Sequence, residues 1–483
     1  MDHQRDADIA HHDLHPHQRR GIRHPIAVAG SDVPFATTNP ATGVVEQRFD
    51  PHGPAEVDAR LERASSAYRA FRRTTLDERA RLMNGAAELL EGELPVVARM
   101  VTTEMGKTFA QARGEVAKCA MALRWFAEHA PDLLADEEVT SASRVRYEPI
   151  GPVLAVMPWN FPLWQVIRFA APALMLGNAG LLKHASNVPQ TALYLEDLFR
   201  RAGYPEGVFT TLLIGSADVA GVIADDRVAA VTLTGSEAAG RAVASAAGQA
   251  LKKCVLELGG SDPFVVLASA DLDRAVPTAV QARCQNNGQS CIAAKRFVVV
   301  AQVADEFADR FTEAMAAQVV GDPLAPETDV GPLVSEAQRA EIAAQVDDAR
   351  LLGATVRCGG QAQEGPGWYY PPTVLTDVTP SMRAYGEEVF GPVAVVEVAE
   401  DADHALALAN RTSFGLGASV WTSDESEQRR YVAELEAGQV FVNAMVASTP
   451  ELPFGGIKRS GFGRELSQLG IREFANAKAV HVA

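Results

Sequence analysis

The chain has 483 residues, of which 47% are hydrophobic and 22% are charged. This composition is typical of a soluble globular protein, and the length allows about three domains of ordinary size. Asp and Glu number 61 against 44 for Lys and Arg, which gives a net charge of −17. We therefore expect neither nucleic acid nor a membrane as the main partner, because both attract a positive surface.

Histidines are concentrated at the N-terminus, where six of the eleven lie within the first 25 residues. That stretch contains no apolar run long enough for the core of a signal peptide. We interpret residues 1–34 as a flexible or disordered tail, or an expression remnant. Metal capture by the tail is the alternative, with candidate ligands His11, His12, His15 and His17. No metal site is predicted elsewhere.

The five cysteines are widely spaced, and no C-x-x-C motif occurs. This pattern favours neither a disulfide framework nor a zinc site. Free thiols fit a reducing compartment, so we expect a cytoplasmic protein.

Hydrophobic periodicity predicts helices from about residue 55 to residue 135, where apolar residues recur every three or four positions. Residues 139–150 are polar and β-prone, which predicts a projecting hairpin. A regular alternation of apolar runs with helical stretches then begins. The runs predict buried strands at 152–157, 180–183, 208–213, 228–233 and 253–257.

A second alternation follows Gly260. It predicts strands at 263–267, 296–300, 394–398, 417–421 and 439–442, and helices near 271–286, 303–319, 336–352 and 424–437. Strands that alternate with helices imply parallel sheets with right-handed crossovers. The predicted fold is therefore α/β, with two doubly wound parallel-sheet domains. The last apolar run, 478–482, is a further candidate strand, which with the hairpin could pair with a neighbouring subunit.

One candidate phosphate site is Thr234-Gly235-Ser236, followed by Gly240, where a predicted strand turns into a helix. N–H groups at a helix N-terminus bind pyrophosphate, and glycines let a ligand approach the main chain. A helix N-cap at Ser236 with packing glycines is the alternative, and the spacing departs from G-x-G-x-x-G.

Three further residues suggest chemistry. Asn160, in Pro158–Pro162, follows the first predicted strand and could donate to an oxyanion or be an ordinary turn residue. Glu257 precedes Leu258-Gly259-Gly260, and Cys291 follows it by 34 residues. A lone Cys is more often a buried apolar residue than a nucleophile, so neither residue is persuasive alone.

Together these segments resemble the aldehyde dehydrogenase superfamily, from about Phe35 to the C-terminus. The motifs in matching order are PWNFP, TGSxxxG, ELGG, NNGQSC, EEVFGP and PFGGIKRSGFGRE. KHASNVP (183–189), ELGGSDPF (257–264) and PWNFPLWQVIRF (158–169) are most similar to the short, NADP-type succinate-semialdehyde dehydrogenases.

The resemblance implies oxidation of succinate semialdehyde to succinate with NAD(P). Cys291 would attack the aldehyde to form a thiohemiacetal, and Asn160 with the Cys291 N–H would hold its oxyanion. Loss of hydride would leave a thioester, which water activated by Glu257 would hydrolyse. Three alternatives stay open: another aldehyde or ω-oxo acid such as glutarate semialdehyde, a CoA-acylating variant, and a catalytically retired binding protein.

The resemblance also assigns cofactor contacts. Lys183 would contact the adenosine ribose and Glu388 the nicotinamide ribose. The remaining cofactor positions are Trp159, Ser186, Gly235, Ser236, Gly240, Leu258 and Phe390. The family often has Glu where this chain has Ser186, and a carboxylate there would repel a 2′-phosphate. We therefore expect NADP, with NAD possible.

For the substrate, the resemblance points to Arg168, Ser448 and Phe454. Arg168 could clamp a substrate carboxylate, or it could form a structural ion pair. Phe454 could form an aromatic wall or be ordinary core. Longer relatives place a second Arg six residues before the nucleophile, where this chain has Gln285.

The implied domains are cofactor binding at 35–136 and 151–258, catalysis at 259–465, and a small oligomerisation flap at 137–150 and 466–483. A homodimer or homotetramer is expected.

Overall fold

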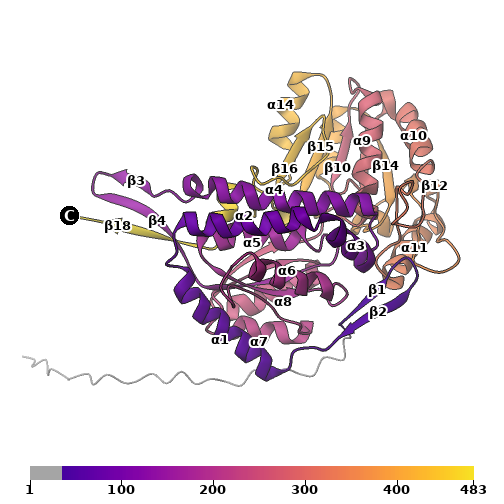
Figure 1. Ribbon diagram of the computed structural model, residues 1–483. Helices are drawn as coiled ribbons and strands as arrows, with labels where there is room; N and C mark the ends of the chain where they lie inside the picture. The colour runs from indigo at the N-terminus through magenta and orange to yellow at the C-terminus, as the bar shows by residue number, and fades with distance from the viewer. Residues whose placement is uncertain (1–34) are drawn as a thin grey trace, which may run out of the picture.

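The computed structural model describes residues 35–483. The predicted tail and its histidines lie outside the described residues. Two large sheets and two small ones organise the chain, and helices cover the large sheets (Figure 1). The protein is therefore α/β, as predicted. Within the described part, no helix combines the length and apolar character needed to cross a bilayer.

The first large sheet has six strands in the order β17-β9-β8-β5-β6-β7. Its parallel strands are β5 (Pro152–Met157), β6 (Ala179–His184), β7 (Phe209–Thr211), β8 (Ala230–Thr234) and β9 (Lys253–Glu257). The short β17 (Gly461–Phe462) pairs antiparallel with β9. Strand order reverses at β5, which has β6 on one side and β8 on the other. Doubly wound sheets bind ligands at such a reversal, beyond the carboxyl ends of the strands.

Helices cover both faces of this sheet because its strands are apolar on both sides. In β5, Val153 and Ala155 pack in one core layer and Leu154 in the other. The first layer contains α2 (Leu76–Gly92), α3 (Leu94–Met105), α4 (Phe109–Leu133), α5 (Trp164–Leu176) and α6 (Pro189–Arg201). The second contains α1 (Pro54–Phe71), α7 (Val219–Ala224) and α8 (Glu237–Gln249).

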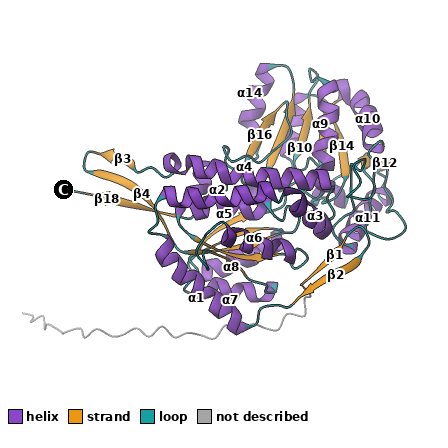
Figure 2. Cartoon of the chain, viewed as in Figure 1, coloured by secondary structure: helices purple, strands orange, loops and turns teal. Residues whose placement is uncertain are grey.

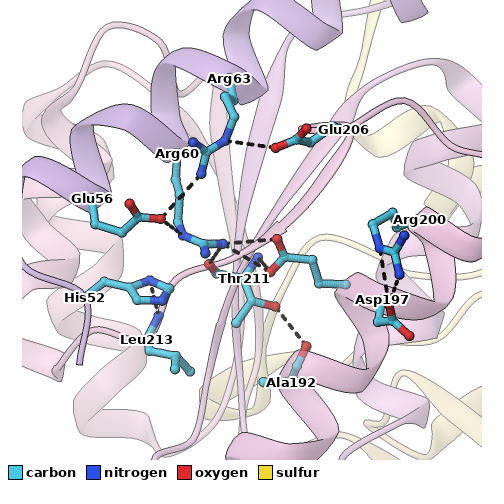
Figure 3. Close-up of polar contacts among 11 residues, drawn as sticks. His52, Glu56, Arg60, Arg63, Ala192, Asp197, Arg200, Glu206, Thr211 and Leu213 are labelled. Carbon is cyan, nitrogen blue, oxygen red and sulfur yellow. Dashed lines mark hydrogen bonds and ion pairs between the residues drawn. The ribbon is translucent and has the colours of Figure 1, made fainter. Parts of the chain in front are cut away.

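Polar contacts hold the edge strand β7 between α1 and α6 (Figure 3). Arg60 of α1 donates to the Glu196 carboxylate of α6 at 3.0 Å and to the Thr211 carbonyl at 3.1 Å. Glu196 in turn accepts from the Thr211 N–H at 2.9 Å. Burial lowers the pKa of the neighbouring His52 to about 4. These contacts cover a strand edge that would otherwise be open to pairing.

The second large sheet has seven strands in the order β12-β13-β14-β11-β10-β15-β16. They are β10 (Pro263–Val266), β11 (Arg296–Val300), β12 (Thr355–Cys358), β13 (Thr373–Thr376), β14 (Val393–Ala399), β15 (Gly417–Trp421) and β16 (Gln439–Val442). All are parallel except β12. One face packs on α9 (Leu272–Cys284) and α10 (Ala301–Ala316), and the other on α11 (Glu336–Leu351), α13 (Ala402–Asn410) and α14 (Glu425–Glu434).

The predicted hairpin is present as β3 (Glu137–Thr140) and β4 (Ser143–Pro149). The C-terminal strand β18 (Ala475–His481) follows the short helix α15 (Ser467–Glu473) and pairs antiparallel with β4 of the same chain. This three-stranded sheet projects from the body (Figure 2). All four residues of β3 are exposed.

The strands predicted for both large sheets are all present, but the sequence reasoning missed several short elements. They include the helices α13 and α15, the strands β12, β13 and β17, and the hairpin of β1 (Phe35–Asn39) and β2 (Val44–Phe49). The helix predicted near 271–286 ends at Cys284. It ends there because Asn286 and Asn287 both have φ of 57°, in the left-handed region, where asparagine is among the better tolerated residues.

Candidate active site

The turn that carries Asn160 follows β5 and is held by buried side chains of other elements. Glu115 of α4 accepts from the N–H groups of Leu163 and Trp164, both at 2.9 Å, and so caps the start of α5. Lys107 balances this carboxylate at 2.5 Å. His184 Nε2 donates to the carbonyl at the end of the turn at 2.9 Å. These buried hydrogen bonds hold the backbone of the turn, and with it Asn160, in one position.

The loop that carries Cys291 follows α9 and is also held from within the protein. Lys295 Nζ donates to the carbonyls of Ser290, Cys291 and Ala293 at 3.0, 2.8 and 3.1 Å. The left-handed Asn287 donates from Nδ2 to the carbonyl of Gly106 at 2.9 Å. A buried lysine ammonium and a side-chain amide therefore position the loop.

The structure brings Asn160 and the Cys291 loop together. Asn160 Nδ2 donates to the carbonyl of Gln289 at 3.1 Å, two residues before the cysteine. Asn286 Nδ2 donates back to the carbonyl of Asn160 at 2.8 Å. The amide predicted to hold an oxyanion thus lies against the loop of the predicted nucleophile.

The surroundings of Cys291 favour the protonated thiol over the thiolate. Burial raises its pKa to about 12, while the cations Arg168 and Lys295 oppose the shift. The carboxylates of Glu388 and Asp262 reinforce it. Because the thiolate is the reactive form, the site needs a base or a bound ligand to favour it.

Glu257 lies at the carboxyl end of β9, and its carboxyl group is buried with no hydrogen-bond partner on either oxygen. Burial and then the charge of Glu465 raise its pKa well above the usual range, while Arg168 and Arg464 oppose the shift. A carboxyl with a raised pKa suits general base catalysis near neutral pH. The charge of Arg168 lowers the pKa of both Glu257 and Cys291, so one cation favours the charged forms of both predicted catalytic groups.

The predicted cofactor residues lie at the carboxyl ends of the three strands around the reversal. Trp159 follows β5, Lys183 is the next-to-last residue of β6, and Ser236 follows β8. Ser236 caps α8, because its Oγ accepts from the Ala239 N–H at 3.3 Å. The Ser236 side chain therefore acts as the N-cap of α8, and phosphate binding by the backbone N–H groups at the start of α8 stays a prediction.

Close packing accounts for Gly240 within the same segment. A Cβ at Gly240 would lie 2.7 Å from Leu258 Cδ2, so any larger residue would require the Leu258 side chain to shift. Gly235 precedes the cap, and its N–H donates to the Glu257 carbonyl at 3.0 Å. The TGSxxxG segment is thus joined to the strand that carries Glu257.

The second large sheet contributes the other side of the predicted cofactor site. Phe390 contacts Trp159 edge to face, with 5.8 Å between the ring centroids. Glu388 accepts from the Gly260 N–H at 3.0 Å and lies 3.6 Å from Lys295 Nζ. These contacts bring EEVFGP, PWNFP and ELGG together. Ser186 is half-buried, three residues after Lys183.

A cavity of about 100 Å³ lies beside Cys291. Its lining includes the predicted substrate residues Arg168, Ser448 and Phe454, together with Gln285. Arg168 forms a buried ion pair with Glu465 and lies 4.3 Å from the centroid of the Phe454 ring. Arg168 is therefore part of a structural ion pair, which was one of the two expectations for it. Its binding of a substrate carboxylate stays a prediction.

Sequence reasoning missed four charged residues of the site. Glu465 was within the quoted PFGGIKRSGFGRE motif, and Lys295 follows the cysteine by four residues. Lys118 and Glu115 belong to α4, which is remote from every motif in sequence, so no local pattern indicated them. Lys118 lines the cavity, where its Nζ donates to Ser448 Oγ at 2.8 Å.

The fold and these motifs define the class of the protein. The chain belongs to the aldehyde dehydrogenase family, whose sequence profile matches residues 28–480.

More specific likenesses extend over nearly the whole chain. Succinate-semialdehyde dehydrogenase (NADP(+)) 1 of Mycobacterium ulcerans is 58% identical over 457 residues, which are 93% of this chain and 100% of that protein. Succinate-semialdehyde dehydrogenase (NADP(+)) of Mycobacterium avium is also 58% identical and covers 93% of this chain and 97% of its own. The solved succinic semialdehyde dehydrogenase from Streptococcus pyogenes, in complex with NADP+ as the cofactor, has a TM-score of 0.91 and 37% identity and covers 92% and 99% of the two chains.

Proposed function

We propose that this protein oxidises succinate semialdehyde to succinate with NADP. The observation that carries the proposal is a thiol, Cys291, in the wall of a cavity whose other lining residues include two cations, Lys118 and Arg168, and no carboxylate. An aldehyde that carries a carboxylate fits such a cavity, because the negative charge finds opposite charge there. The names of the mycobacterial relatives support the same substrate and cofactor.

In the proposed chemistry, Cys291 loses its proton to a base, adds to the aldehyde carbon as the thiolate and forms the oxyanion of a thiohemiacetal. Asn160 Nδ2 and the Cys291 N–H hold the oxyanion, and the loss of one such donor slows turnover about 10²- to 10³-fold. Glu257 takes a proton from the water that hydrolyses the thioester. When bound, NADP supplies the acceptor for the hydride that leaves the thiohemiacetal.

The residues around β5, β6 and β8 fit a phosphorylated dinucleotide. Lys183 has its pKa lowered by burial alone, so no nearby carboxylate balances its charge among the described residues. A 2′-phosphate would supply that balance, and the half-buried Ser186 adds a neutral hydroxyl rather than a repelling charge. The backbone at Gly235 and Ser236 would hold the pyrophosphate, and Glu388 with Phe390 and Trp159 would hold the nicotinamide end.

For the whole chain we propose cofactor binding by 35–136 and 151–258, catalysis by 259–465, and a flap of 137–150 and 466–483. A cytoplasmic homodimer or homotetramer fits the exposed edge of β3 and the composition.

The decisive experiment compares steady-state kcat/KM for NADP and for NAD with three aldehydes: succinate semialdehyde, glutarate semialdehyde and butanal. Butanal has the same carbon chain length as succinate semialdehyde but no carboxylate. We expect succinate semialdehyde with NADP to give the highest value. A preference for butanal would overturn the assignment of substrate. Full activity in Cys291→Ala would overturn the covalent chemistry, and product formation only with CoA would indicate the acylating alternative. Absence of NADPH formation with every aldehyde would indicate a retired binding protein.

A further inference from the structure

The cavity beside Cys291 is lined by one partly buried cation, Lys118, whose charge no carboxylate of the described residues pairs with directly. Arg168 is paired with Glu465, so its charge is compensated. Among the described residues, the one carboxylate that acts on Lys118 is Glu115, and Glu115 is already paired with Lys107. Burial lowers the pKa of Lys118 to about 8, as expected for an ammonium without a counter-ion.

Lys118 also determines which way the Ser448 hydroxyl can donate. Ser448 Oγ accepts from Lys118 Nζ at 2.8 Å and from Trp164 Nε1 at 3.0 Å. A hydroxyl has two acceptor sites and one donor, so both acceptor sites of this oxygen are occupied. Its O–H is left to donate to a ligand in the cavity.

A third donor lies on the same cavity. Gln285 Nε2 is buried and has no hydrogen-bond partner within the described chain. An unpaired buried donor is unfavourable and becomes satisfied when a ligand supplies an acceptor. Lys118, Ser448 and Gln285 thus offer an ammonium, a hydroxyl and an amide, and all three donate.

We propose that Lys118 supplies the cation for the carboxylate of the substrate, beside Ser448, which the family resemblance already assigns to the substrate, and the unpaired amide of Gln285. The proposal rests on the proposed function and adds to it the residue that selects a charged aldehyde. The ammonium lies 4.1 Å from the centroid of the Trp164 ring, which holds it in place through a cation–π contact. A carboxylate bound there receives a charge-assisted hydrogen bond from Lys118 and a second bond from Ser448.

A purely structural lysine, which only supports Trp164 and Ser448, is the competing interpretation. Its removal would impair every aldehyde alike, whereas loss of a carboxylate subsite impairs charged aldehydes selectively. The informative quantity is therefore the kcat/KM for succinate semialdehyde divided by that for butanal.

The experiment measures this ratio with NADP for the wild type and three variants. Lys118→Met removes the charge and keeps an apolar stem, and Lys118→Arg keeps a cation. Arg113→Met removes an exposed cation from the same helix, five residues away, and serves as the matched control. We expect Lys118→Met to lower the ratio about 10- to 100-fold, mainly through a higher KM for succinate semialdehyde. Arg113→Met should leave the ratio unchanged, and Lys118→Arg should restore most of it.

A second measurement covers the case in which Lys118→Met is poorly active. Isothermal titration of succinate, the product, needs no turnover, and circular dichroism reports whether the variant is folded. Loss of succinate binding in a folded variant supports the proposal. An unchanged substrate ratio, or unchanged succinate affinity, overturns it. These outcomes differ from failure of the proposed function, in which the wild type itself would not prefer succinate semialdehyde over butanal.

Discussion

At the scale of single residues, the proposed chemistry depends on the pKa values of Cys291 and Glu257, which burial and neighbouring charges shift. Cys291 and Glu257 are both shifted toward their neutral forms, mainly because burial disfavours charge. Arg168 opposes both shifts and is itself held by Glu465. Because the thiolate and the carboxylate are the reactive forms, each group needs a base or a bound ligand that favours its charged form.

The raised pKa of Cys291 predicts how the free enzyme reacts with an alkylating agent. Since the thiolate is the nucleophile and the thiol pKa is about 12, the thiolate fraction should rise about tenfold per pH unit from pH 7 to pH 9. Peptide mass spectrometry after iodoacetamide treatment can follow Cys291 separately from the half-buried Cys254 and Cys358. A rate that levels off below pH 9 would mean that Arg168 and Lys295 lower the pKa of Cys291 more than burial raises it.

Ser186 offers a test of cofactor choice. A carboxylate at this position, three residues after Lys183, would repel the 2′-phosphate of NADP. We expect Ser186→Glu to lower the ratio of kcat/KM for NADP over NAD about tenfold or more. Ser66→Glu adds the same charge on the exposed face of α1 and should leave the ratio unchanged. Equal losses for both cofactors in Ser186→Glu would place the phosphate elsewhere.

At the scale of elements, α4 supports the active site although it carries no predicted catalytic residue. Its Glu115 caps α5 and positions the turn with Asn160, and its Lys118 contacts Ser448. Both residues face the site because they are three positions apart and so lie on one face of the helix. A substitution of Glu115 should therefore mainly lower stability, whereas a substitution of Lys118 should mainly change the choice of substrate.

The buried pair of Glu115 and Lys107 makes a stability prediction. Glu115→Ala leaves a buried lysine without its partner and frees two N–H groups, so we expect a loss of about 3–5 kcal/mol. Burial already lowers the pKa of Lys107. Glu91→Ala on α2 removes a partly exposed pair with Arg124 of α4 and should cost less than about 1 kcal/mol. Urea unfolding followed by circular dichroism measures both, and similar midpoints for the two variants would contradict this account.

At the scale of the whole molecule, the flap of β3, β4 and β18 projects from the body with its two edge strands, β3 and β18, open. Val139 in β3 is 65% exposed and Val482, just after β18, is 61% exposed, although both are apolar. A projecting sheet with apolar side chains and open edges favours association with another subunit.

Deletion of residues 476–483 should therefore convert the proposed oligomer into monomer. Val139→Asp is the milder variant, because an exposed side chain can change without loss of internal packing. Light scattering after size exclusion gives the mass, and circular dichroism checks the fold. An unchanged mass in both variants would place the subunit contact outside the flap.

Hydrophobic periodicity was enough to predict the alternation of strands and helices, because the period of apolar residues follows from which faces are buried. It also indicated Cys291, Glu257 and Asn160, since each lies in a recognisable motif at the end of a predicted strand or near one. It did not indicate the short edge strands β12 and β17, which have few residues and weak apolar patterns. Nor did it indicate that the helix before Cys291 stops at Cys284.

The pairing of buried charges could be seen only in the folded chain. Arg168 could have been a free clamp or half of an ion pair, and only the fold brings Glu465, nearly three hundred residues later, to its side. Lys118 and Ser448 are 330 residues apart, and their contact depends on packing between α4 and the second sheet's loops. Local sequence patterns reflect local periodicity and turn chemistry, whereas the balance of buried charge depends on residues that only the folded chain brings within a few ångströms of each other.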